Sequence, residues 1–196
     1  MSFRLILASS SPYRQQLLKK LGLPFSCISP DIDERPLVNE RSQTLAQRLS
    51  IEKARAVANQ AGEVLIIGSD QVCCLDGQPL GKPGNPQNAI AQLQRLSGRA
   101  VTFYTGLCLI NNHTGTCQSC VEPFTVHFKK LSLEQIQAYV EKDRPWDCAG
   151  SFKAEGLGIA LFERLEGEDP NALTGLPLIR LIQLLKNEGI DVFTAC

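Results

Sequence analysis

The sequence lacks an excess of either charge, a long apolar run and all but two histidines. Twenty Lys and Arg side chains balance 20 Asp and Glu side chains in 196 residues. This balance excludes a general affinity for nucleic acid or for an anionic membrane surface. No stretch approaches the ~20 apolar residues that cross a bilayer, and the first residues lack the apolar core of a signal peptide. We therefore expect a cytoplasmic protein with no nucleic-acid and no membrane partner.

The cysteines do not form a recognisable ligand set or disulfide framework. Without a secretion signal, reduced thiols in apolar stretches are expected rather than disulfides. Cys117 and Cys120 form a C-x-x-C pair, but no second pair or histidine follows at zinc-ligand spacing, so we interpret the pair as alternation on a strand. The eight cysteines are scattered, at positions 27, 73, 74, 108, 117, 120, 148 and 196.

The composition is that of an ordinary folded protein. Hydrophobic residues make up 43% of the chain, with 15 Gly and 11 Pro, and this mixture excludes disorder and a fibrous repeat. The length suits a single domain that covers residues 1–196.

Strand and helix signals alternate along the chain and then give way to a hairpin. Apolar runs predict strands at Phe3–Ala8 and Val64–Ser69. Ser11 as N-cap and Pro12 at the first helical position predict a helix that ends at Gly22. The remaining predictions are helices at 42–60, 85–98, 132–141 and 176–185, a hairpin over 100–111 and 116–129, and a strand at 157–165. This order indicates an α/β fold with a mixed, twisted sheet flanked by helices.

The segment between the first strand and the first helix suits a phosphate group. Ser9, Ser10 and Ser11 offer hydroxyl donors at a helix N-terminus, where unpaired N–H groups and a partial positive charge attract anions. Arg14 adds a forked cation in the first turn. A simple N-cap followed by a surface arginine accounts for the same residues, so this loop by itself leaves both interpretations open.

Asp70 follows the buried strand predicted at Val64–Ser69. This position places its carboxylate at the carboxyl edge of the sheet, where ligands of open α/β folds bind. There it can accept a proton from water or hold a metal ion bound to phosphate. The alternative is a turn aspartate that caps the next segment.

Cations and carboxylates on separate segments complete a candidate triphosphate site. Lys53 lies on a predicted helix, Lys82 stands between Gly81 and Pro83 on a rigid turn, and Lys153 follows later in the chain. Lysines and carboxylates near a phosphate-ready helix start suggest metal-assisted chemistry on a triphosphate. The accompanying carboxylates are Asp31, Asp33, Glu34, Glu155 and Asp169. Spacing alone does not show that these residues converge.

Two aromatic side chains bear on the question of a base. Tyr13 lies beside the serine turn and can stack on an aromatic ring, although a tyrosine at the edge of a core is the more common case. Trp146 is expected in the core or at an interface rather than in a ligand site.

Eight ordered motifs resemble those of the Maf family of nucleotide pyrophosphatases along almost the whole chain. They are Ala8-Ser9-x-Ser11-Pro12-x-Arg14, Asp33-Glu34, Glu52-Lys53-Ala54, Gly68-Ser69-Asp70, Gly81-Lys82-Pro83, Tyr104-Thr105-Gly106, Ala149-Gly150-Ser151-Phe152-Lys153-x-Glu155-Gly156 and Gly175-Leu176-Pro177. The resemblance implies a Maf/ITPase-like fold of two lobes with a cleft. It also implies hydrolysis of a nucleoside triphosphate to the monophosphate and diphosphate with a divalent cation, Mg²⁺ or Mn²⁺. Family members are often homodimers, a state that is open to this chain.

The resemblance further implies roles for single residues. In the family the aspartate that matches Asp70 is the base that activates water, and we expect Glu34 and Asp70 to hold the metal ion. Positions that line the phosphates match six residues of this chain: Ser9, Ser11, Arg14, Lys53, Lys82 and Lys153.

The expected substrate rests on three further residues. Gln71 after Asp70, together with Glu155, is similar to the branch of the family that prefers 7-methyl-GTP, whereas branches acting on dTTP and UTP carry Thr and Gln there. That branch often has tryptophan where Tyr13 stands. Two alternatives stay open: a dTTP/UTP pyrophosphatase of the same family, and a non-catalytic regulator of septum formation.

Overall fold

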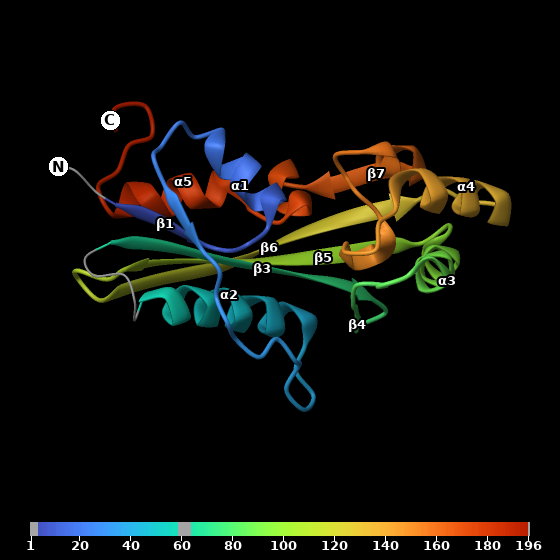
Figure 1. Ribbon diagram of the computed structural model, residues 1–196, viewed down its shortest axis with the longest axis horizontal. Coiled ribbons are helices and arrows are strands. Elements are labelled where there is room, and N and C mark those ends of the chain that lie inside the picture. The colour runs from blue at the N-terminus through green and yellow to red at the C-terminus, as the bar shows by residue number, and fades with distance from the viewer. Residues whose placement is uncertain (1–3, 59–63, 196) are drawn as a thin grey trace.

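The computed structural model describes residues 4–58 and 64–195, and its centre is a mixed sheet (Figure 1). The strands are β1 (Leu5–Ala8), β2 (Ser26–Ile28), β3 (Leu65–Leu75), β4 (Gln78–Leu80), β5 (Ala100–Asn111), β6 (Thr116–Phe128) and β7 (Phe162–Gly167). The sheet order is β2-β1-β3-β5-β6-β7, with β4 also paired to β3. The pairs β1–β2 and β1–β3 are parallel, and the other pairs are antiparallel.

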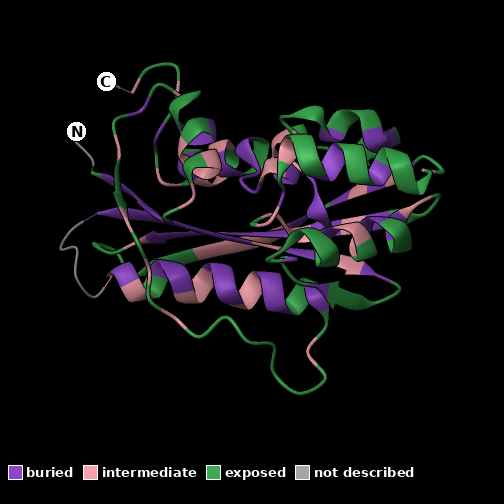
Figure 2. Cartoon of the chain, turned by 45° about the vertical axis from the view of Figure 1, so that its right-hand side comes forward, coloured by how far each residue is buried: buried purple, intermediate pink, exposed green. Residues whose placement is uncertain are grey.

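Helices cover both faces of this sheet. The α-helices are α1 (Pro12–Lys19), α2 (Ser42–Ala58), α3 (Pro86–Leu96), α4 (Leu133–Asp143) and α5 (Leu178–Asn187), and the short 3-10 helices are η1 (Ala149–Ser151), η2 (Leu157–Leu161) and η3 (Pro170–Thr174). Figure 1 shows α2 along one face, α1 and α5 on the other, and α3 and α4 together at one end. The buried side of α2 faces the sheet in Figure 2.

The core forms four clusters, of which two smaller ones lie under α2 and the two largest lie toward opposite ends of the long strands. One cluster joins α3, α4 and β7 to the sheet and includes four aromatic rings in edge-to-face contact: Phe103, Phe128, Phe152 and Phe162. Trp146 packs against it, partly buried. A second cluster joins α1 and α5 to the sheet and includes Leu7, Leu18, Ile67 and Leu181. The strands β3, β5 and β6 therefore link two lobes, which confirms the expected fold.

The strand that carries Asp70 is longer than predicted. Instead of ending at Ser69, β3 continues to Leu75, because β5 pairs with its residues 65–74 and Asp70 faces Gly106. On the other edge, β1 pairs only with residues 65–68 and β4 only with residues 73–75. Residues 69–72 thus face a gap between these two short strands. Asp70 lies beyond the carboxyl end of β1 rather than that of its own strand.

The other sequence predictions are largely confirmed. The helix starts at Ser11 and at Asn85 and the capping box of Ser132 and Gln135 are present, and the predicted hairpin is β5–β6. The predicted strand at 157–165 is wrong in its first half, where η2 replaces it before β7 begins. The chain turns tightly there, since a Cβ on Gly158 would lie 2.3 Å from the Lys153 carbonyl oxygen. Residues 3, 59 and 60 of the predicted elements lie outside the described residues.

Cysteine and hydropathy patterns complete the description. Cys117 and Cys120 lie on β6, as interpreted, and the seven cysteines among the described residues are free thiols. Across residues 4–58 and 64–195, the helices are too short or too polar to traverse a bilayer.

Candidate active site

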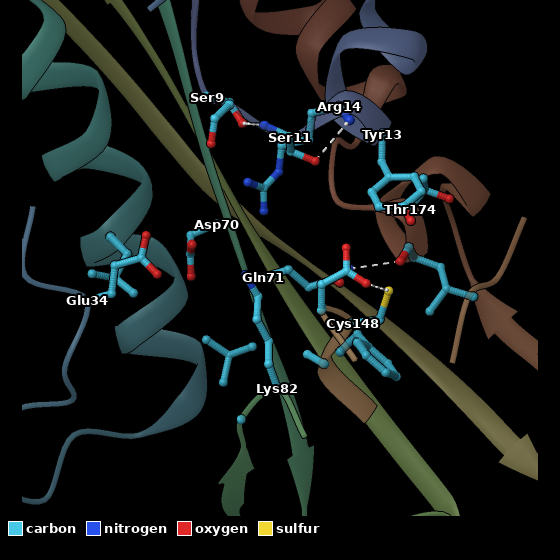
Figure 3. A pocket seen from close by; sticks show the side chains of 18 of the residues that line it. Ser9, Ser11, Tyr13, Arg14, Glu34, Asp70, Gln71, Lys82, Cys148 and Thr174 are labelled. Atoms are coloured by element: carbon cyan, nitrogen blue, oxygen red, sulfur yellow. Dashed lines mark hydrogen bonds between the residues drawn. The ribbon is translucent and has the colours of Figure 1, made fainter. Parts of the chain in front are cut away.

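A cleft of about 760 Å³ opens beside the unpaired edge of β3, between the two lobes. Its size is in the range of pockets that take a small-molecule ligand. Figure 3 shows the side chains that point into it from both lobes. All the predicted site residues line this cleft: Ser9, Ser11, Tyr13, Arg14, Glu34, Lys53, Asp70, Gln71, Lys82, Lys153 and Glu155. Of the other carboxylates considered, Asp31, Asp33 and Asp169 are absent from the lining formed by the described residues.

Lys53 lies between two carboxylates at the floor of the cleft. Its Nζ is 2.6 Å from Asp70 Oδ1 and 2.6 Å from Glu34 Oε1. The Lys53 and Asp70 side chains are about nine-tenths buried, whereas the Glu34 side chain is 58% exposed. Pairing and hydrogen bonds offset the cost of burying charged groups of this kind. The cluster therefore joins α2, β3 and the segment before α2 at one point.

Two glycines bring α2 close enough for this contact. A Cβ on Gly68 of β3 would lie 2.1 Å from the Ser50 carbonyl oxygen, and one on Gly106 of β5 would lie 2.1 Å from the Ala46 carbonyl oxygen. Any side chain at these two positions would push α2 off the sheet. Because Gly68 and Asp70 are two residues apart, their side-chain positions face the same helix, on which Lys53 lies.

The turn between β1 and α1 forms the wall above Asp70. Ser9 is buried, and its Oγ accepts a 3.1 Å hydrogen bond from the Ser11 N–H. Ser11 Oγ in turn accepts one of 3.5 Å from the Arg14 N–H, as its N-cap role predicts. Figure 3 shows the serines and Arg14 on the same side of the cleft, above Asp70.

Charged groups at the end of the cleft near Asp70 shift one another's pKa values. Burial lowers the pKa of the Arg14 guanidinium, and the carboxylates of Asp70 and Glu34 oppose that change. Partial burial raises the pKa of the Glu34 carboxyl, but the hydrogen bond from Lys53 and the charges of Lys53, Lys82 and Arg14 outweigh it and leave the pKa below its ordinary value. Both observations place Arg14 within the field of the same two carboxylates.

The other end of the cleft, the acidic end around Tyr13, has two carboxylates, those of Asp147 and Glu155, and the Lys153 ammonium lies near Cys148. Tyr13, Asp147, Cys148 and Glu155 all line it. The Cys148 thiol donates a 3.5 Å hydrogen bond to Asp147 Oδ1. Burial, followed by the charges of Cys148, Asp147 and Glu155, raises the pKa of the Tyr13 phenol to about 12. Tyr13 therefore remains a neutral ring in surroundings that favour positive charge.

The side chains of Gln71 and Lys153 both donate hydrogen bonds to backbone carbonyl oxygens. The Gln71 amide donates hydrogen bonds to the carbonyl oxygens of Ala172 (2.8 Å) and Leu173 (3.0 Å) and so ties η3 to β3. The Lys153 Nζ donates a 2.7 Å bond to the Asp143 carbonyl oxygen at the end of α4. Gln71 thus shapes the wall, to which Leu173 and Thr174 contribute.

The carboxylates of Asp70 and Glu34 fit a divalent metal ion. Mg²⁺ and Mn²⁺ take oxygen ligands, and Mg²⁺ is often held by one or two carboxylates together with phosphate oxygens and water. Asp70 Oδ1 and Glu34 Oε1 both contact Lys53 Nζ, beside Arg14 and the serine turn, so the second oxygen of each carboxylate is the one open to a metal ion. No cluster of three or more His, Cys, Asp or Glu side chains occurs in the described part of the chain, and phosphate oxygens or water would supply the other ligands.

Sequence reasoning missed several residues of the cleft. Asp147 and Cys148 directly precede the motif that begins at Ala149, and this adjacency was the available signal. Leu173 and Thr174 belong to η3 and directly precede the motif that begins at Gly175, which gave the same kind of signal. They reach the cleft through the Gln71 hydrogen bonds, which join residues about a hundred positions apart.

Residues 4–188 match the family model described as Maf-like protein. The chain belongs to this family. Curated relatives include proteins named 7-methyl-GTP pyrophosphatase from Vibrio vulnificus, 56% identical over 97% of this chain and 98% of the relative, and from Pseudoalteromonas atlantica, 58% identical over 97% of both.

Solved structures support the fold of this Maf-like chain. A HAM1 protein from Coxiella burnetii has a TM-score of 0.57 at 19% identity, and the Staphylococcus aureus Ham1 protein has 0.55 at 14% identity. Each covers 95% of this chain and is itself covered completely. At this identity the likeness extends to the fold only.

Proposed function

We propose that this protein hydrolyses 7-methyl-GTP to 7-methyl-GMP and diphosphate. The observation that carries the proposal is the charge arrangement of the cleft, which is basic around Arg14, Lys53 and Lys82 and acidic around Tyr13. 7-Methyl-GTP has a matching arrangement, with an anionic triphosphate at one end and a positively charged methylated ring at the other. Relatives of that name, more than half identical over nearly the whole chain, support the same substrate.

The phosphates are assigned to the basic end. Ser9 and Ser11 offer hydroxyl groups at the start of α1, where free N–H groups and the helix dipole favour an anion. Arg14, Lys53 and Lys82 supply positive charge from three different elements. Lys153 lines the cleft as well and donates to the Asp143 carbonyl oxygen, an acceptor that a phosphate oxygen would join or replace.

The methylated base is assigned to the acidic end. Methylation at N7 puts a positive charge on guanine, and the Tyr13 ring gains a cation–π attraction of roughly 0.5–2 kcal/mol when it stacks on such a ring. The Glu155 carboxylate can accept hydrogen bonds from the guanine edge and offset the ring charge. Gln71 contributes indirectly, because it holds the η3 wall in place.

Asp70 is assigned as the base for the attacking water. Lys53 engages Oδ1 and fixes the carboxylate, so Oδ2 is the oxygen that we assign to the water proton. A divalent ion held by Asp70, Glu34 and phosphate oxygens would neutralise phosphate charge. Lys53 and Arg14 hold the phosphates and carboxylates in line within a largely buried floor, where electrostatic interactions are strong.

One domain and a cytoplasmic location are part of the proposal. Both lobes contribute lining residues, such as Ser9 from one and Lys153 from the other, so residues 1–196 act as one unit. The free thiols of Cys73 and Cys108 suit a reducing compartment.

The test is diphosphate release by the purified protein with Mg²⁺ or Mn²⁺. We compare 7-methyl-GTP, GTP, dTTP and UTP, with Asp70→Asn as control. Preference for 7-methyl-GTP that disappears in Asp70→Asn supports reaction, substrate and base. Preference for dTTP or UTP contradicts the substrate and keeps the reaction. No hydrolysis of any of the four contradicts the enzyme and favours a regulator of septum formation.

A further inference from the structure

Glu34 reaches the cleft from a segment that hydrophobic burial holds on one side only, at Ile32. Residues 29–41, between β2 and α2, have no helix or strand. Ile32 packs, partly buried, against the cluster of Leu45 and Leu49 on α2, but Leu37 is 60% exposed and Val38 is 93% exposed, so the apolar residues beyond Glu34 remain in water. Figure 2 shows this stretch as an exposed loop that hangs below α2. A loop of this kind needs polar contacts to keep one conformation.

Arg48 of α2 supplies these contacts. Its guanidinium donates two parallel hydrogen bonds to Glu40, from Nε to Oε1 at 2.7 Å and from Nη2 to Oε2 at 2.8 Å. Nη2 also donates a 3.1 Å bond to the Arg35 carbonyl oxygen, and Nη1 a 2.9 Å bond to Glu52 Oε2. Arg48 thereby binds the segment on both sides of its exposed tip, Leu37 and Val38.

The Arg48–Glu40 pair differs from an ordinary surface ion pair. The Glu40 side chain is only 5% exposed and that of Arg48 only 19%. Glu40 Oε2 also accepts a 2.9 Å bond from the Leu37 N–H, so the carboxylate closes a turn inside the segment. The hydrogen bond to Glu40 raises the pKa of Arg48, and that from Arg48 lowers the pKa of Glu40. Bidentate geometry and burial make such a pair much stronger than an exposed one.

We propose that Arg48 is a positioning residue for hydrolysis: by fixing residues 35–40 it holds the adjacent Glu34 against Lys53. This inference rests on the proposed function. Arg48 is not among the described residues that line the cleft, whereas Glu34 and Lys53 are. Arg35, whose carbonyl oxygen Arg48 binds, directly follows Glu34. Arg48 therefore acts on the reaction through this segment, in which Glu34 is the charged residue that lines the cleft.

A double-mutant cycle tests this dependence. We compare kcat and KM for 7-methyl-GTP in wild type, Arg48→Ala, Glu34→Gln and the double variant. We expect Arg48→Ala to lower kcat/KM at least tenfold in the wild-type background and less than twofold when Glu34 is already Gln. Equal losses in both backgrounds overturn the inference. No loss in Glu34→Gln itself overturns instead the role proposed for Glu34, so the two failures are distinguishable.

The matched control removes an arginine from the same segment. The Arg35 side chain forms an exposed pair with Asp33 at 2.6 Å, and the two side chains are 87% and 59% exposed. Arg35→Ala leaves its carbonyl oxygen available to Arg48, so we expect kcat/KM within twofold of wild type. A tenfold loss in this control overturns the assignment to Arg48.

A structural readout keeps the inference testable without turnover. The Leu37 N–H donates to Glu40 Oε2 at 2.9 Å, so its hydrogen exchange, followed by NMR, reports whether the segment keeps its conformation. We expect this exchange to be at least tenfold faster in Arg48→Ala and within twofold of wild type in Arg35→Ala. An unchanged exchange rate in Arg48→Ala overturns the inference. If Arg48→Ala does not fold, Glu40→Gln, which keeps one acceptor for Arg48, is measured with the same expectations at reduced size.

Discussion

The carbonyl oxygen of Gly175 accepts a 2.8 Å hydrogen bond from Nε of Arg14, which precedes it by 161 residues. Ser69 Oγ donates to the same oxygen at 2.9 Å. The turn after η3 therefore orients the guanidinium that we assign to the phosphates. Gly175 has φ of +101°, and a Cβ added there would lie 3.2 Å from Arg14 Nε. The backbone conformation at Gly175 thus influences the position of the Arg14 side chain.

Gly175→Ala should impair both stability and turnover. The positive φ costs a side chain about 1–3 kcal/mol, and the added methyl group displaces Arg14 from its position. We expect a lower melting temperature and a loss of kcat/KM of about tenfold or more, because small misplacements of a positioning group are costly. The control is Gly115→Ala in the β5–β6 turn, with φ of +76° and nothing within 4 Å. Equal kcat/KM losses in both variants, measured below their melting temperatures, would show that strain alone is responsible.

The contribution of Glu34 to stability should depend on pH. Burial raises the pKa of this carboxyl, and the Lys53 hydrogen bond together with nearby positive charge lowers it further than burial raises it. A carboxyl with a depressed folded pKa stabilises the protein above its unfolded pKa and loses that effect as pH falls through its folded pKa. We therefore expect the difference in unfolding free energy between wild type and Glu34→Gln to be constant above about pH 5.5 and to shrink below about pH 4.5.

Urea denaturation at a series of pH values measures this difference. Glu163→Gln, at an exposed position on β7, gives the background effect of losing one carboxyl. A difference for Glu34→Gln that grows as the pH falls would contradict the sign derived from the Lys53 contact.

Local signals predicted the helices better than the strands. Ser11 and Asn85 are N-caps because their side chains satisfy N–H groups only a few residues away. The extent of β3 depends instead on pairing with β5, a partner distant in sequence, so polar residues at 69–71 did not end it. The error at 157–165 has the same origin, since the tight approach of Gly158 to Lys153 is not visible in hydropathy.

Which residues line the site could be predicted from the sequence better than how they contact one another. Family resemblance brought together residues that spacing alone could not, and they line one cleft. The contact of Lys53 with both Asp70 and Glu34 did not follow from the sequence, because it requires α2 to pack closely on Gly68. The contact of Arg48 with Glu40 did not follow from the sequence either, because an arginine and a glutamate eight residues apart give no signal of burial.

Gly68→Ala should be severely destabilising. The added Cβ would lie 2.1 Å from the Ser50 carbonyl oxygen and 2.9 Å from both N and Cβ of Ala54, so α2 must move away from the sheet. We expect a loss of about 3 kcal/mol or more in unfolding free energy, at the upper end of overpacking effects. Gly81→Ala, where nothing lies within 4 Å, is the control for stability alone and should be neutral. A Gly68→Ala protein as stable as Gly81→Ala would refute the close packing of α2.

Glu155→Gln should change selectivity more than turnover. Glu155 is exposed at the rim of the cleft, near enough to Tyr13 for its charge to raise the pKa of that phenol. The amide keeps a hydrogen-bond acceptor but loses the charge that favours a cationic ring, a change worth about 1 kcal/mol at a partly exposed site. We expect the ratio of kcat/KM for 7-methyl-GTP to that for GTP to fall about fivefold, while kcat for GTP changes less than twofold. Glu163→Gln, outside the cleft, controls for the loss of a carboxylate. An unchanged ratio in Glu155→Gln would remove Glu155 from substrate discrimination and leave Tyr13 and Asp147 as the groups that face the methylated base.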